Sequence, residues 1–300
     1  MDFDVIIIGA GPAGLTAALY CGRADLKTLI LESTGAGGQL NYIYEIDNYP
    51  GFFGKGTELA EKFRGQALKF GGVFSSERVL EINSLDNGVK AVKTRKNEYR
   101  AKAVIIATGA TPRTLGAIGE KEFTGKGVSY CATCDGAFFK DKTVSVVGGG
   151  NTAFQDALYL SKFCHAVYLI HRREAFRASA FLVNKVKSNS KIIMRTNEVV
   201  EEIKGNDMVN SLVLKNTASS AISTIDTSAL FIAAGRVPNS DFAKNILTLD
   251  ENGYILTDVN MKTNIDGIYA VGDVRKSPLR QILTAAADGA IAANDIAMNM

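Results

Sequence analysis

The chain has 300 residues, 46% of them hydrophobic, which is enough for two domains that each bury a core. Its 34 basic and 31 acidic residues leave a formal charge of +3, and no long run of one sign occurs. Net charge therefore gives no reason to expect a nucleic acid or a membrane surface as a partner. These bounds fit a globular α/β enzyme.

The N-terminal sequence MDFDVIIIGAG has no basic segment, and its apolar run is far shorter than the roughly 18 residues of a membrane-spanning helix. The cytoplasm is therefore the expected location. Cys21 and Cys164 lie apart from each other and from the two remaining cysteines, unlike the dense pattern of a small secreted domain. In a reducing compartment a close cysteine pair is more often catalytic than structural.

The first segment of the chain predicts a strand, a glycine turn and a helix. VIII (5–8) is a buried strand that runs into GAGPAG (9–14) and the small-residue helix LTAALYCGRA (15–24). Glycines at this spacing allow a tight turn and a close approach to a pyrophosphate, which the helix N-terminus favours. The next strand, KTLILE (27–32), ends in Glu32, whose carboxylate can accept hydrogen bonds from an adenosine ribose. A dinucleotide site is predicted here.

Further along, after the apolar strand VIIATGATPR (104–113), SYCATCDGAF (129–138) holds two cysteines two residues apart. Such a pair can close a small disulfide, and this spacing often lowers the pKa of one thiol. Zinc needs about four ligands, and the remaining candidates, Cys164 and His165, are badly spaced to supply them together. We therefore favour a redox pair over a zinc half-site. Asp135 can exchange protons beside the thiols, or it can belong to an Asp-Gly turn.

A second copy of the dinucleotide-binding plan begins after the cysteines. Its glycine motif GGGNTA (148–153) corresponds to the first motif, and its AAG (233–235) corresponds to ATG (107–109). Because the copies differ in length and loops, we expect a duplicated domain and not a solenoid. The predicted elements are the strand TVSVVGGG (143–150), a helix from residue 151 through DALYLSKF, the strand AVYLIHRR (166–173) and LFIAAGRVPN (230–239).

The second copy has basic residues where the first has an acid. His171, Arg172 and Arg173 stand at the strand end, and Arg177 follows one helical turn beyond. An acid repels a 2′-phosphate, whereas guanidinium groups bind it with charge-assisted hydrogen bonds. A solvated basic face is the alternative, but the position after a glycine motif favours a site for NADPH over NADH. Two different nucleotides in one chain indicate a flavin and a pyridine nucleotide, with hydride transfer between them.

The C-terminal part, from about residue 243, is too short for a third core and is expected to complete the first domain. It contains the strand GIYAVGDVR and a final small-residue helix, LTAAADGAIAANDIAM. Asp273 follows the strand, where it can hold a sugar-chain hydroxyl or act as a turn residue. Arg280 and Gln281 begin the last helix, and a helix N-terminus pointed at an isoalloxazine ring stabilises the negative charge of the reduced flavin.

Together these motifs resemble those of the low-molecular-weight bacterial thioredoxin reductases, which are flavin disulfide reductases. The resemblance extends over the whole chain. The motifs that carry it are GAGPAG (9–14), GGQL (37–40), NYPGF (48–52), ATGATPR (107–113), CATCDG (131–136), GGGNTA (148–153), HRREAFR (171–177), GDVR (272–275) and RQILTAAADGAIAA (280–293).

The resemblance implies an α/β fold with two Rossmann-like domains, the NADPH domain inserted into the FAD domain. FAD would bind residues 1–113 with 243–300, and NADPH would bind residues 114–242, which carry the cysteines. It also implies a homodimer and an electron path from NADPH through FAD and a Cys131/Cys134 disulfide to thioredoxin, with rotation of the NADPH domain between half-reactions.

Three catalytic roles follow from the same resemblance. Cys134 is the flavin-proximal thiol, Cys131 attacks the partner disulfide, and Asp135 protonates the leaving thiolate; no metal is expected. The candidate cofactor-binding residues are Gly9, Gly11, Pro12, Ala13, Gly14, Glu32, Gly38, Gln39, Leu40, Asn48, Thr108, Gly109, Gly148, Gly150, Asn151, Thr152, Ala153, His171, Arg172, Arg173, Arg177, Gly235, Arg236, Gly272, Asp273, Arg280, Gln281 and Ile282.

One departure from the family pattern concerns Asn41, Tyr42, Ile43 and Tyr44, which follow GGQL where the family usually has small threonines. The alternatives within this fold are a reductase for a glutaredoxin-like protein or a peroxiredoxin, a ferredoxin-linked variant and a thiol oxidase. From other classes, a nucleotide-binding redox sensor and a zinc-binding interaction module are the alternatives. The ferredoxin-linked relatives and the oxidases lack the NADPH motifs that this chain keeps.

Overall fold

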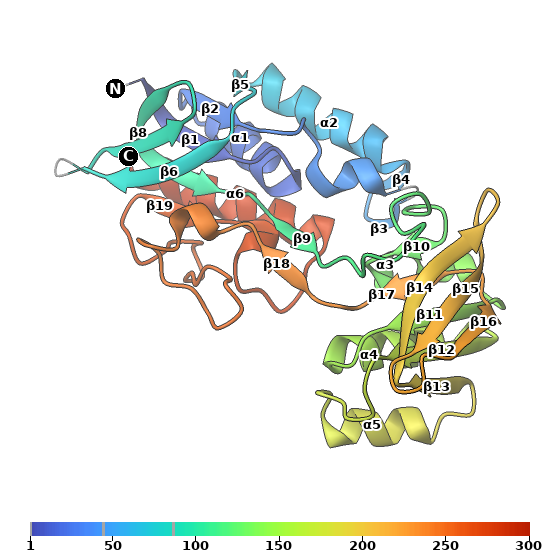
Figure 1. Ribbon diagram of the computed structural model, residues 1–300. Helices are drawn as coiled ribbons and strands as arrows, with labels where there is room; N and C mark the ends of the chain where they lie inside the picture. The colour runs from blue at the N-terminus through green and yellow to red at the C-terminus, as the bar shows by residue number, and fades with distance from the viewer. Residues whose placement is uncertain (1, 44–45, 86–87) are drawn as a thin grey trace. The chain divides into compact units, whose positions relative to one another are not determined.

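The computed structural model describes residues 2–43, 46–85 and 88–300, and the chain forms two units (Figure 1). Unit 1 consists of residues 1–111 and 237–300, and unit 2, residues 112–236, is inserted between these two segments. The boundaries expected from the sequence, after residues 113 and 242, lie two and six residues later than these (113 against 111, and 242 against 236). The assignment of each unit to one nucleotide stays a prediction.

A seven-stranded sheet forms the centre of unit 1, in the order β5-β2-β1-β8-β7-β6, with β19 also paired to β8. Strands β5, β2, β1, β8 and β19 are parallel, whereas β6 and β7 continue the sheet in antiparallel fashion. The strands are β1 (Phe3–Ile8), β2 (Thr28–Leu31), β5 (Val73–Ser75), β6 (Val79–Ser84), β7 (Lys90–Thr94), β8 (Glu98–Ile106) and β19 (Ile268–Ala270).

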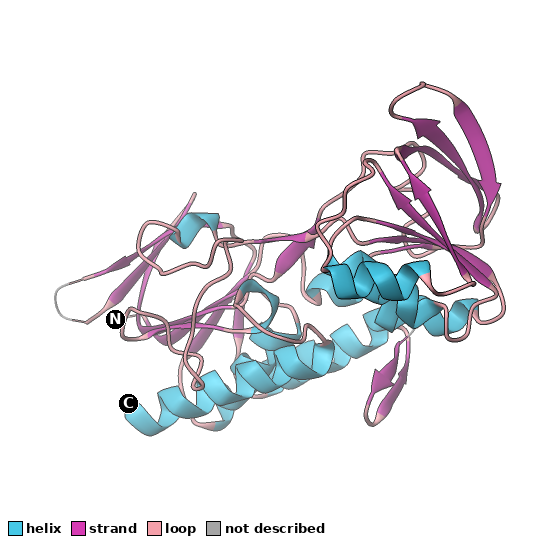
Figure 2. Cartoon of the chain, turned by 90° about the horizontal axis from the view of Figure 1, so that it is seen from below, coloured by secondary structure: helices cyan, strands magenta, loops and turns pink. Residues whose placement is uncertain are grey.

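Helices cover one face of this sheet (Figure 2). Side chains of β1 alternate between two hydrophobic clusters, one on each face of the sheet. Val5 and Ile7 pack with the helices, while Ile6 and Ile8 pack on the opposite face. A Cβ on Gly289 would lie 2.2 Å from the Ala13 carbonyl oxygen, so the first and last helices approach closely. The helices are α1 (Pro12–Arg23), α2 (Gly56–Lys69) and α6 (Ile282–Asn299), with the 3₁₀ turns η1 (Gly38–Tyr42), η3 (Asp241–Ala243) and η4 (Gly272–Val274).

Unit 2 repeats the parallel arrangement in the order β10-β17-β11-β12-β13. Its helices α4 and α5 cover one face through a cluster that includes Val146, Phe154 and Val186, and a three-stranded antiparallel sheet, β14-β15-β16, packs on the other. The elements are β10 (Val128–Ser129), α3 (Ala132–Asp135), η2 (Gly136–Phe139), β11 (Thr143–Val147), α4 (Asn151–Leu160), β12 (Ala166–His171), α5 (Ala180–Lys187), β13 (Ile192–Thr196), β14 (Glu198–Gly205), β15 (Val209–Asn216), β16 (Ile222–Asp226) and β17 (Leu230–Ile232).

Two short two-stranded sheets complete the fold. β3 (Ile46–Tyr49) and β4 (Phe52–Gly54) form a hairpin, and β9 (Ala110–Pro112) pairs with β18 (Arg236–Pro238) where the chain passes between the units. The predicted strand 230–239 is thus two strands, β17 and β18, separated at Gly235, whose φ is +96°. Within the described ranges, no helix is both long and apolar enough to cross a membrane.

Candidate functional site

The first glycine loop, between β1 and α1, is packed too tightly for side chains at two of its glycines. Gly9 has a φ of +105°, and a Cβ there would lie 2.4 Å from the Ala107 carbonyl oxygen. A Cβ on Gly14 would lie 2.0 Å from the carbonyl oxygen of Gly9. At Gly11, by contrast, a Cβ would meet no atom within 4 Å. Space for a ligand therefore lies beside Gly11, where a pyrophosphate can approach the backbone.

The N-terminus of α1 faces the same loop. Gly11 is its N-cap residue, Pro12 begins the helix, and no side chain caps the free backbone N–H groups. Pro12 fits here because the first turn leaves N–H groups without helical partners, and proline has none to lose. The uncapped amides and the helix dipole suit an anion, so this end of α1 fits the diphosphate of a dinucleotide.

The Glu32 carboxylate, just past β2, is fixed against this loop. Its Oε2 accepts a hydrogen bond of 2.8 Å from the Ala10 backbone N–H, and its Oε1 accepts bonds from the Thr34 N–H (2.8 Å) and hydroxyl (3.0 Å). A carboxylate has about four lone-pair sites, so acceptor capacity remains for ribose hydroxyls. The predicted ribose acceptor therefore lies beside the predicted phosphate site.

Unit 1 also joins predicted residues that are far apart in the sequence. Gln39 Nε2 donates to Asp273 Oδ2 at 3.1 Å, and Asn48 Nδ2 donates to Gln281 Oε1 at 3.3 Å. Each pair is more than 230 positions apart, so both segments of unit 1 supply the site. Thr108 exchanges two hydrogen bonds with Asn239: its hydroxyl donates to the Asn239 carbonyl (2.7 Å), and Asn239 Nδ2 donates to the Thr108 carbonyl (2.8 Å).

Asp288 on α6 holds the turn that carries Asp273, a role not identified from the sequence. Its Oδ2 accepts from the Gly272 N–H at 3.0 Å and from Arg275 Nε at 2.7 Å, while Oδ1 accepts from Arg275 Nη2 at 3.1 Å. Asp288 is buried, and a bidentate guanidinium pair is strong when little water reaches it. Arg275 belongs to the motif GDVR and Asp288 to RQILTAAADGAIAA, so neither motif alone shows that the two residues pair.

Arg280 and Gln281 lie at the N-terminus of α6, and Gln281 is its N-cap residue. The guanidinium of Arg280 stacks over the Tyr254 ring, 4.1 Å from its centroid. Its Nε is a buried atom with no hydrogen-bond partner within the described ranges. Gln281 forms a capping box with Thr284, whose hydroxyl accepts from the Gln281 N–H at 3.0 Å. The orphaned Nε gives Arg280 a free donor for a ligand group at this helix end.

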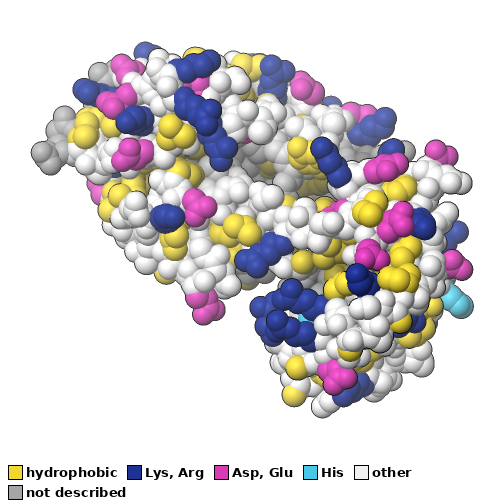
Figure 3. Space-filling model, viewed as in Figure 1, with side chains coloured by type: hydrophobic (Ala, Val, Ile, Leu, Met, Phe, Trp, Pro, Cys, Tyr) yellow, Lys and Arg dark blue, Asp and Glu magenta, His cyan; other side chains and the backbone are white. Residues whose placement is uncertain are grey.

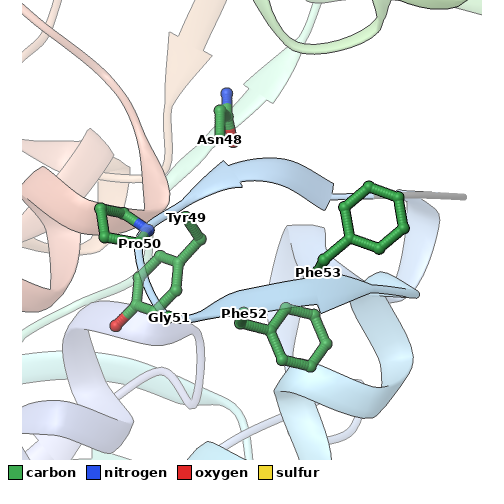
Figure 4. Close-up of a pocket in the computed structure, with 6 residues that line it drawn as sticks. All are labelled: Asn48, Tyr49, Pro50, Gly51, Phe52 and Phe53. Atoms are coloured by element: carbon green, nitrogen blue, oxygen red, sulfur yellow. The ribbon is translucent and has the colours of Figure 1, made fainter.

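The β3-β4 hairpin lines a surface hollow of about 540 Å³ beside Asn48 (Figure 4). In the close-up, Asn48 and Phe53 lie on one side of the hairpin, whereas Tyr49 and Phe52 point to the other side. Tyr49 packs edge-to-face against Phe63 of α2, with ring centroids 6.0 Å apart. Phe53 is exposed, so the hollow is an open surface feature and not an enclosed pocket.

The segment after GGQL, which departs from the family pattern, forms the end of η1. Asn41 Nδ2 donates to the Ala36 carbonyl at 3.0 Å, which closes its own turn, and Tyr42 is exposed. Leu40 is buried. Tyr44 lies outside the described residues.

The second glycine loop, between β11 and α4, differs in its packing. Gly148 has a φ of +158°, and a Cβ there would lie 2.6 Å from the Ala233 carbonyl oxygen. Around Gly150, as around Gly11, a Cβ would meet nothing within 4 Å, and α4 also lacks a side-chain cap. Asn151 uses its Oδ1 to accept from the Ser179 N–H at 2.8 Å. This loop therefore offers a second site for a diphosphate.

Basic residues gather beside the second loop, and Figure 3 shows Lys and Arg side chains clustered over the part of unit 2 where α4 lies. Arg172, Arg173 and Arg177 are exposed, and within the described ranges none of their guanidinium groups has a hydrogen bond or an ion pair. The Arg177 backbone N–H donates to the Gly149 carbonyl at 2.8 Å, which ties its segment to the loop. Residues 172–179 form bends and not the helical turn expected from the sequence.

His171, at the end of β12, lies directly under the second loop. A Cβ on Gly149 would be 2.2 Å from the His171 ring, so a side chain there would have to displace the ring. Burial lowers the pKa of His171, and the nearby positive charges of Arg172, Arg173 and Arg177 lower it further. A histidine with a lowered pKa therefore lies beside three guanidinium groups that have no ion pair within the described residues, and such guanidinium groups suit a phosphate monoester. Gly235 and Arg236 follow β17, at the carboxyl end of the same parallel sheet.

Cys131 and Cys134 form a disulfide with a Cα–Cα distance of 5.3 Å. Cys131 is the N-cap residue of the short helix α3, which contains Cys134 and Asp135. Thr133 Oγ1 lies 3.5 Å from the Cys131 sulfur. The cysteines are partly exposed and belong to unit 2.

Asp135 is linked to Cys131 through Ser129, which the sequence reading did not identify. The Ser129 hydroxyl donates to Asp135 Oδ2 at 2.5 Å and accepts from the Cys131 N–H at 3.0 Å. Tyr130, the residue between, donates its hydroxyl to the buried Glu120 carboxylate at 2.8 Å. Burial and the Glu120 charge raise the pKa of Tyr130 to about 12, so the phenol stays protonated. The segment before the disulfide is thus anchored on both sides.

The two other cysteines are unsuited to exchange. Burial raises the pKa of Cys21 to about 12 and that of Cys164 to about 11, so neither forms thiolate near neutral pH. Cys164 is buried and donates its thiol to the Phe139 carbonyl at 3.4 Å. Thiol chemistry is therefore confined to Cys131 and Cys134.

Residues 3–289 match the family described as pyridine nucleotide-disulphide oxidoreductase. The chain is 46% identical over 299 residues to a thioredoxin reductase of Peptoclostridium acidaminophilum, which covers 97% of this chain and 95% of that protein. It is 42% identical over 296 residues to a bifunctional thioredoxin reductase/thioredoxin of Mycobacterium leprae, covering 97% of this chain and 64% of that one. The crystal structure of thioredoxin reductase from Streptococcus pyogenes superposes with a TM-score of 0.94 at 42% identity, over 98% of this chain and 96% of that chain.

Proposed function

The chain belongs to the pyridine nucleotide-disulphide oxidoreductase family and, within it, to the thioredoxin reductases, and we propose which of its residues carry out each part of the reaction. It is an NADPH-dependent flavoprotein disulfide oxidoreductase. The observation that carries the proposal is the Cys131–Cys134 disulfide, which lies in the same unit as a glycine loop flanked by unpaired arginines.

We propose that unit 1 holds FAD, which supplies a two-electron carrier between a nicotinamide and a disulfide. The N-terminus of α1 and the open space beside Gly11 suit its diphosphate, and Glu32 suits the adenosine ribose. The pairs Gln39–Asp273 and Asn48–Gln281 bring amide and carboxylate groups from both chain segments to the remaining part of the cofactor. The unpartnered Nε of Arg280 supplies a further donor.

Unit 2 is proposed to bind NADPH. The open space beside Gly150 and the uncapped α4 suit the diphosphate, and Arg172 and Arg177 suit the 2′-phosphate. Because these guanidinium groups have no carboxylate partner within the described ranges, binding a phosphate breaks no existing ion pair. Rotation of unit 2 between the two half-reactions remains a prediction.

Thiol–disulfide exchange then passes the electrons to thioredoxin. The Cys131 thiolate attacks one thioredoxin sulfur, the thioredoxin disulfide breaks, and its other sulfur leaves with the electron pair and takes a proton from Asp135. Cys134 next attacks Cys131 Sγ and gives its thiol proton to the Asp135 carboxylate. The Cys131–Cys134 bond re-forms, and the second thioredoxin sulfur leaves as a thiolate that water protonates.

Thioredoxin as the partner is supported by the relative that joins a thioredoxin reductase and a thioredoxin in one chain. The exposed Phe138, close in sequence to the disulfide, offers an apolar contact for such a partner. We also propose a homodimer in the cytoplasm. Sedimentation equilibrium tests the dimer, since a mass of one chain at micromolar concentration contradicts it.

One experiment tests the assignment as a whole. The purified yellow protein is mixed with NADPH or NADH and an oxidised bacterial thioredoxin, while flavin absorbance and thioredoxin thiols are followed. We expect NADPH to bleach the flavin and thioredoxin to be reduced. Cys131→Ser keeps flavin reduction and abolishes thioredoxin reduction, because the attacking sulfur is gone.

Cys164→Ser is the matched control, because a serine hydroxyl can still donate to the Phe139 carbonyl and the residue is buried away from exchange chemistry. It should keep both activities. If NADPH leaves the flavin oxidised, the enzyme assignment is wrong. If the flavin is bleached but only a glutaredoxin-like protein or a peroxiredoxin is reduced, thioredoxin is the wrong partner.

A further inference from the structure

Ser129, the last residue of β10, stands two positions before Cys131 and is 7% exposed. Its hydroxyl oxygen has three polar neighbours: Asp135 Oδ2 at 2.5 Å, the Cys131 N–H at 3.0 Å and the Cys131 carbonyl oxygen at 3.3 Å. The hydroxyl thus contacts the acid and both backbone groups of the attacking cysteine.

We propose that Ser129 is a positioning residue for thiol–disulfide exchange, which holds the carboxyl group of Asp135 and the backbone of Cys131 in one fixed arrangement. The proposal rests on the proposed function, because it assigns Ser129 a role in delivering the proton of Asp135 to the leaving sulfur.

A hydroxyl suits this position because it has one donor and two acceptor lone pairs. When Asp135 is ionised, the Ser129 O–H donates to its carboxylate and the oxygen accepts from the Cys131 N–H. When Asp135 is protonated, its O–H can donate to the Ser129 oxygen, and the Ser129 proton can turn to the Cys131 carbonyl. The contact therefore persists in both protonation states, and Ser129 keeps its own proton throughout.

The surrounding structure shows why such a contact is needed. Helix α3 has only four residues and no side-chain cap, so its own backbone hydrogen bonds give it little rigidity. Ser129, by contrast, belongs to a strand of the parallel sheet, paired with Phe231 of β17. The hydroxyl transfers the rigidity of that sheet to the acid and the cysteine. Since a misplacement of about 1 Å can cost on the order of a hundredfold in rate, this anchoring affects turnover.

Removing the hydroxyl tests the proposal. In Ser129→Ala we expect the rate of thioredoxin reduction by the reduced enzyme to fall about tenfold, because the acid is present but poorly placed. The KM for thioredoxin and the rate of flavin reduction by NADPH should stay within about twofold of the wild type, because neither depends on the proton of Asp135.

Ser145→Ala is the matched control for lost stability. Ser145 is also a buried serine on a strand of unit 2, and its hydroxyl donates to Thr227 Oγ1 at 3.1 Å and not to the redox motif. Both variants should lower the melting temperature, but only Ser129→Ala should slow exchange. Equal rate losses in the two variants would overturn the proposal.

The leaving group provides a second, independent readout. An aryl disulfide expels a thiolate of low pKa that needs no proton, whereas a dialkyl disulfide expels a basic thiolate that does. Ser129→Ala should therefore slow reduction of a dialkyl disulfide about tenfold and of an aryl disulfide less than twofold. Equal losses with both substrates contradict a role through Asp135.

A double-mutant cycle measures whether Ser129 acts through Asp135. In an Asp135→Asn background, Ser129→Ala should change the rate less than twofold, because there is no acid left to position. An additional tenfold loss would mean that Ser129 acts by another route. If the wild type reduces dialkyl disulfides but not thioredoxin, the proposed partner fails, while the small substrates still decide the role of Ser129.

Discussion

The two glycine loops repeat one backbone plan but differ in the charge that stands beside them. In unit 1 the Glu32 carboxylate is fixed against the loop by the Ala10 and Thr34 N–H groups. In unit 2 the corresponding place holds His171 and exposed arginines that have no ion pair with any residue the structure describes. The shared part, an uncapped helix N-terminus beside an open glycine, can bind any diphosphate. The strand end is therefore what separates one nucleotide from the other.

The loops also differ in how closely helix and strand pack. At the third motif position unit 1 has Gly14, where a Cβ would lie 2.0 Å from the Gly9 carbonyl oxygen. Unit 2 has Ala153 there, and its methyl group is buried in the unit 2 core. The same motif position thus requires glycine in one copy and accepts a methyl group in the other.

The largest effect is expected from placing the residue of unit 2 into unit 1. Gly14→Ala puts a methyl group onto the backbone of Gly9, which must move, and we expect a loss of about 3 kcal/mol of stability. We also expect the variant to lose bound flavin. Urea unfolding and flavin absorbance measure both. The reverse change, Ala153→Gly, should cost only about 1 kcal/mol. A Gly14→Ala protein that stays yellow and stable would show that the two loops pack alike.

The next effect concerns nucleotide choice. Changing Arg172 and Arg177 together to alanine should raise the KM for NADPH about a hundredfold or more, because each charge-assisted hydrogen bond contributes about 1.5–3 kcal/mol and about 1.4 kcal/mol corresponds to tenfold. The KM for NADH should change little. Steady-state kinetics with both nucleotides measures the ratio. Arg64→Ala, which removes an exposed arginine of unit 1, is the control. An equal rise in KM for NADPH and NADH would contradict the proposed contact between these two arginines and the 2′-phosphate.

A smaller effect is expected from the shifted pKa of a carboxyl group in each unit. In unit 2 this group is Asp156, on α4. Burial raises its pKa to about 6, and no hydrogen-bond donor within the described ranges offsets this. Because the folded-state pKa lies above the ordinary value of 3.8, ionisation destabilises the fold as the pH rises from about 3.8 to 6. Asp156→Asn should therefore raise the melting temperature by a few degrees at pH 7 to 8. The gain should disappear below about pH 4, and a variant less stable at pH 8 would contradict this.

The smallest effect is expected at Glu77 in unit 1, where the sign is opposite. Hydrogen bonds from Thr94, Tyr99, Ser75 and Asn97 lower the pKa of Glu77 to about 2. The stabilisation is present above the ordinary pKa of 4.5 and is lost as the pH falls towards 2. Glu77→Gln should lower the melting temperature slightly at pH 7, and the difference should shrink between pH 4.5 and 2. A difference that grows on acidification would exclude this cause.

Much of the fold was predictable because its signals are local. A few neighbouring residues are enough to predict the apolar strands β1 and β11, the glycine turns that follow them and the small-residue helix α6. The predicted helical turn before Arg177 was wrong, since the backbone of residues 172–179 forms bends and is tied to the Gly149 carbonyl. A spacing of four residues does not distinguish a helix from a loop held by a distant partner.

The duplicated dinucleotide plan, the opposite charges at the two strand ends and the close cysteine pair were all predictable, because each depends on residue type at short spacing. Three contacts became known only from the folded chain: Gln39 with Asp273, Arg275 with Asp288, and Ser129 with both Cys131 and Asp135. The first two contacts depend on how the C-terminal segment packs against the N-terminal one, and the third on the angle at which a short helix leaves its strand. Such angles are set by the packing of the whole unit, and no short motif encodes them.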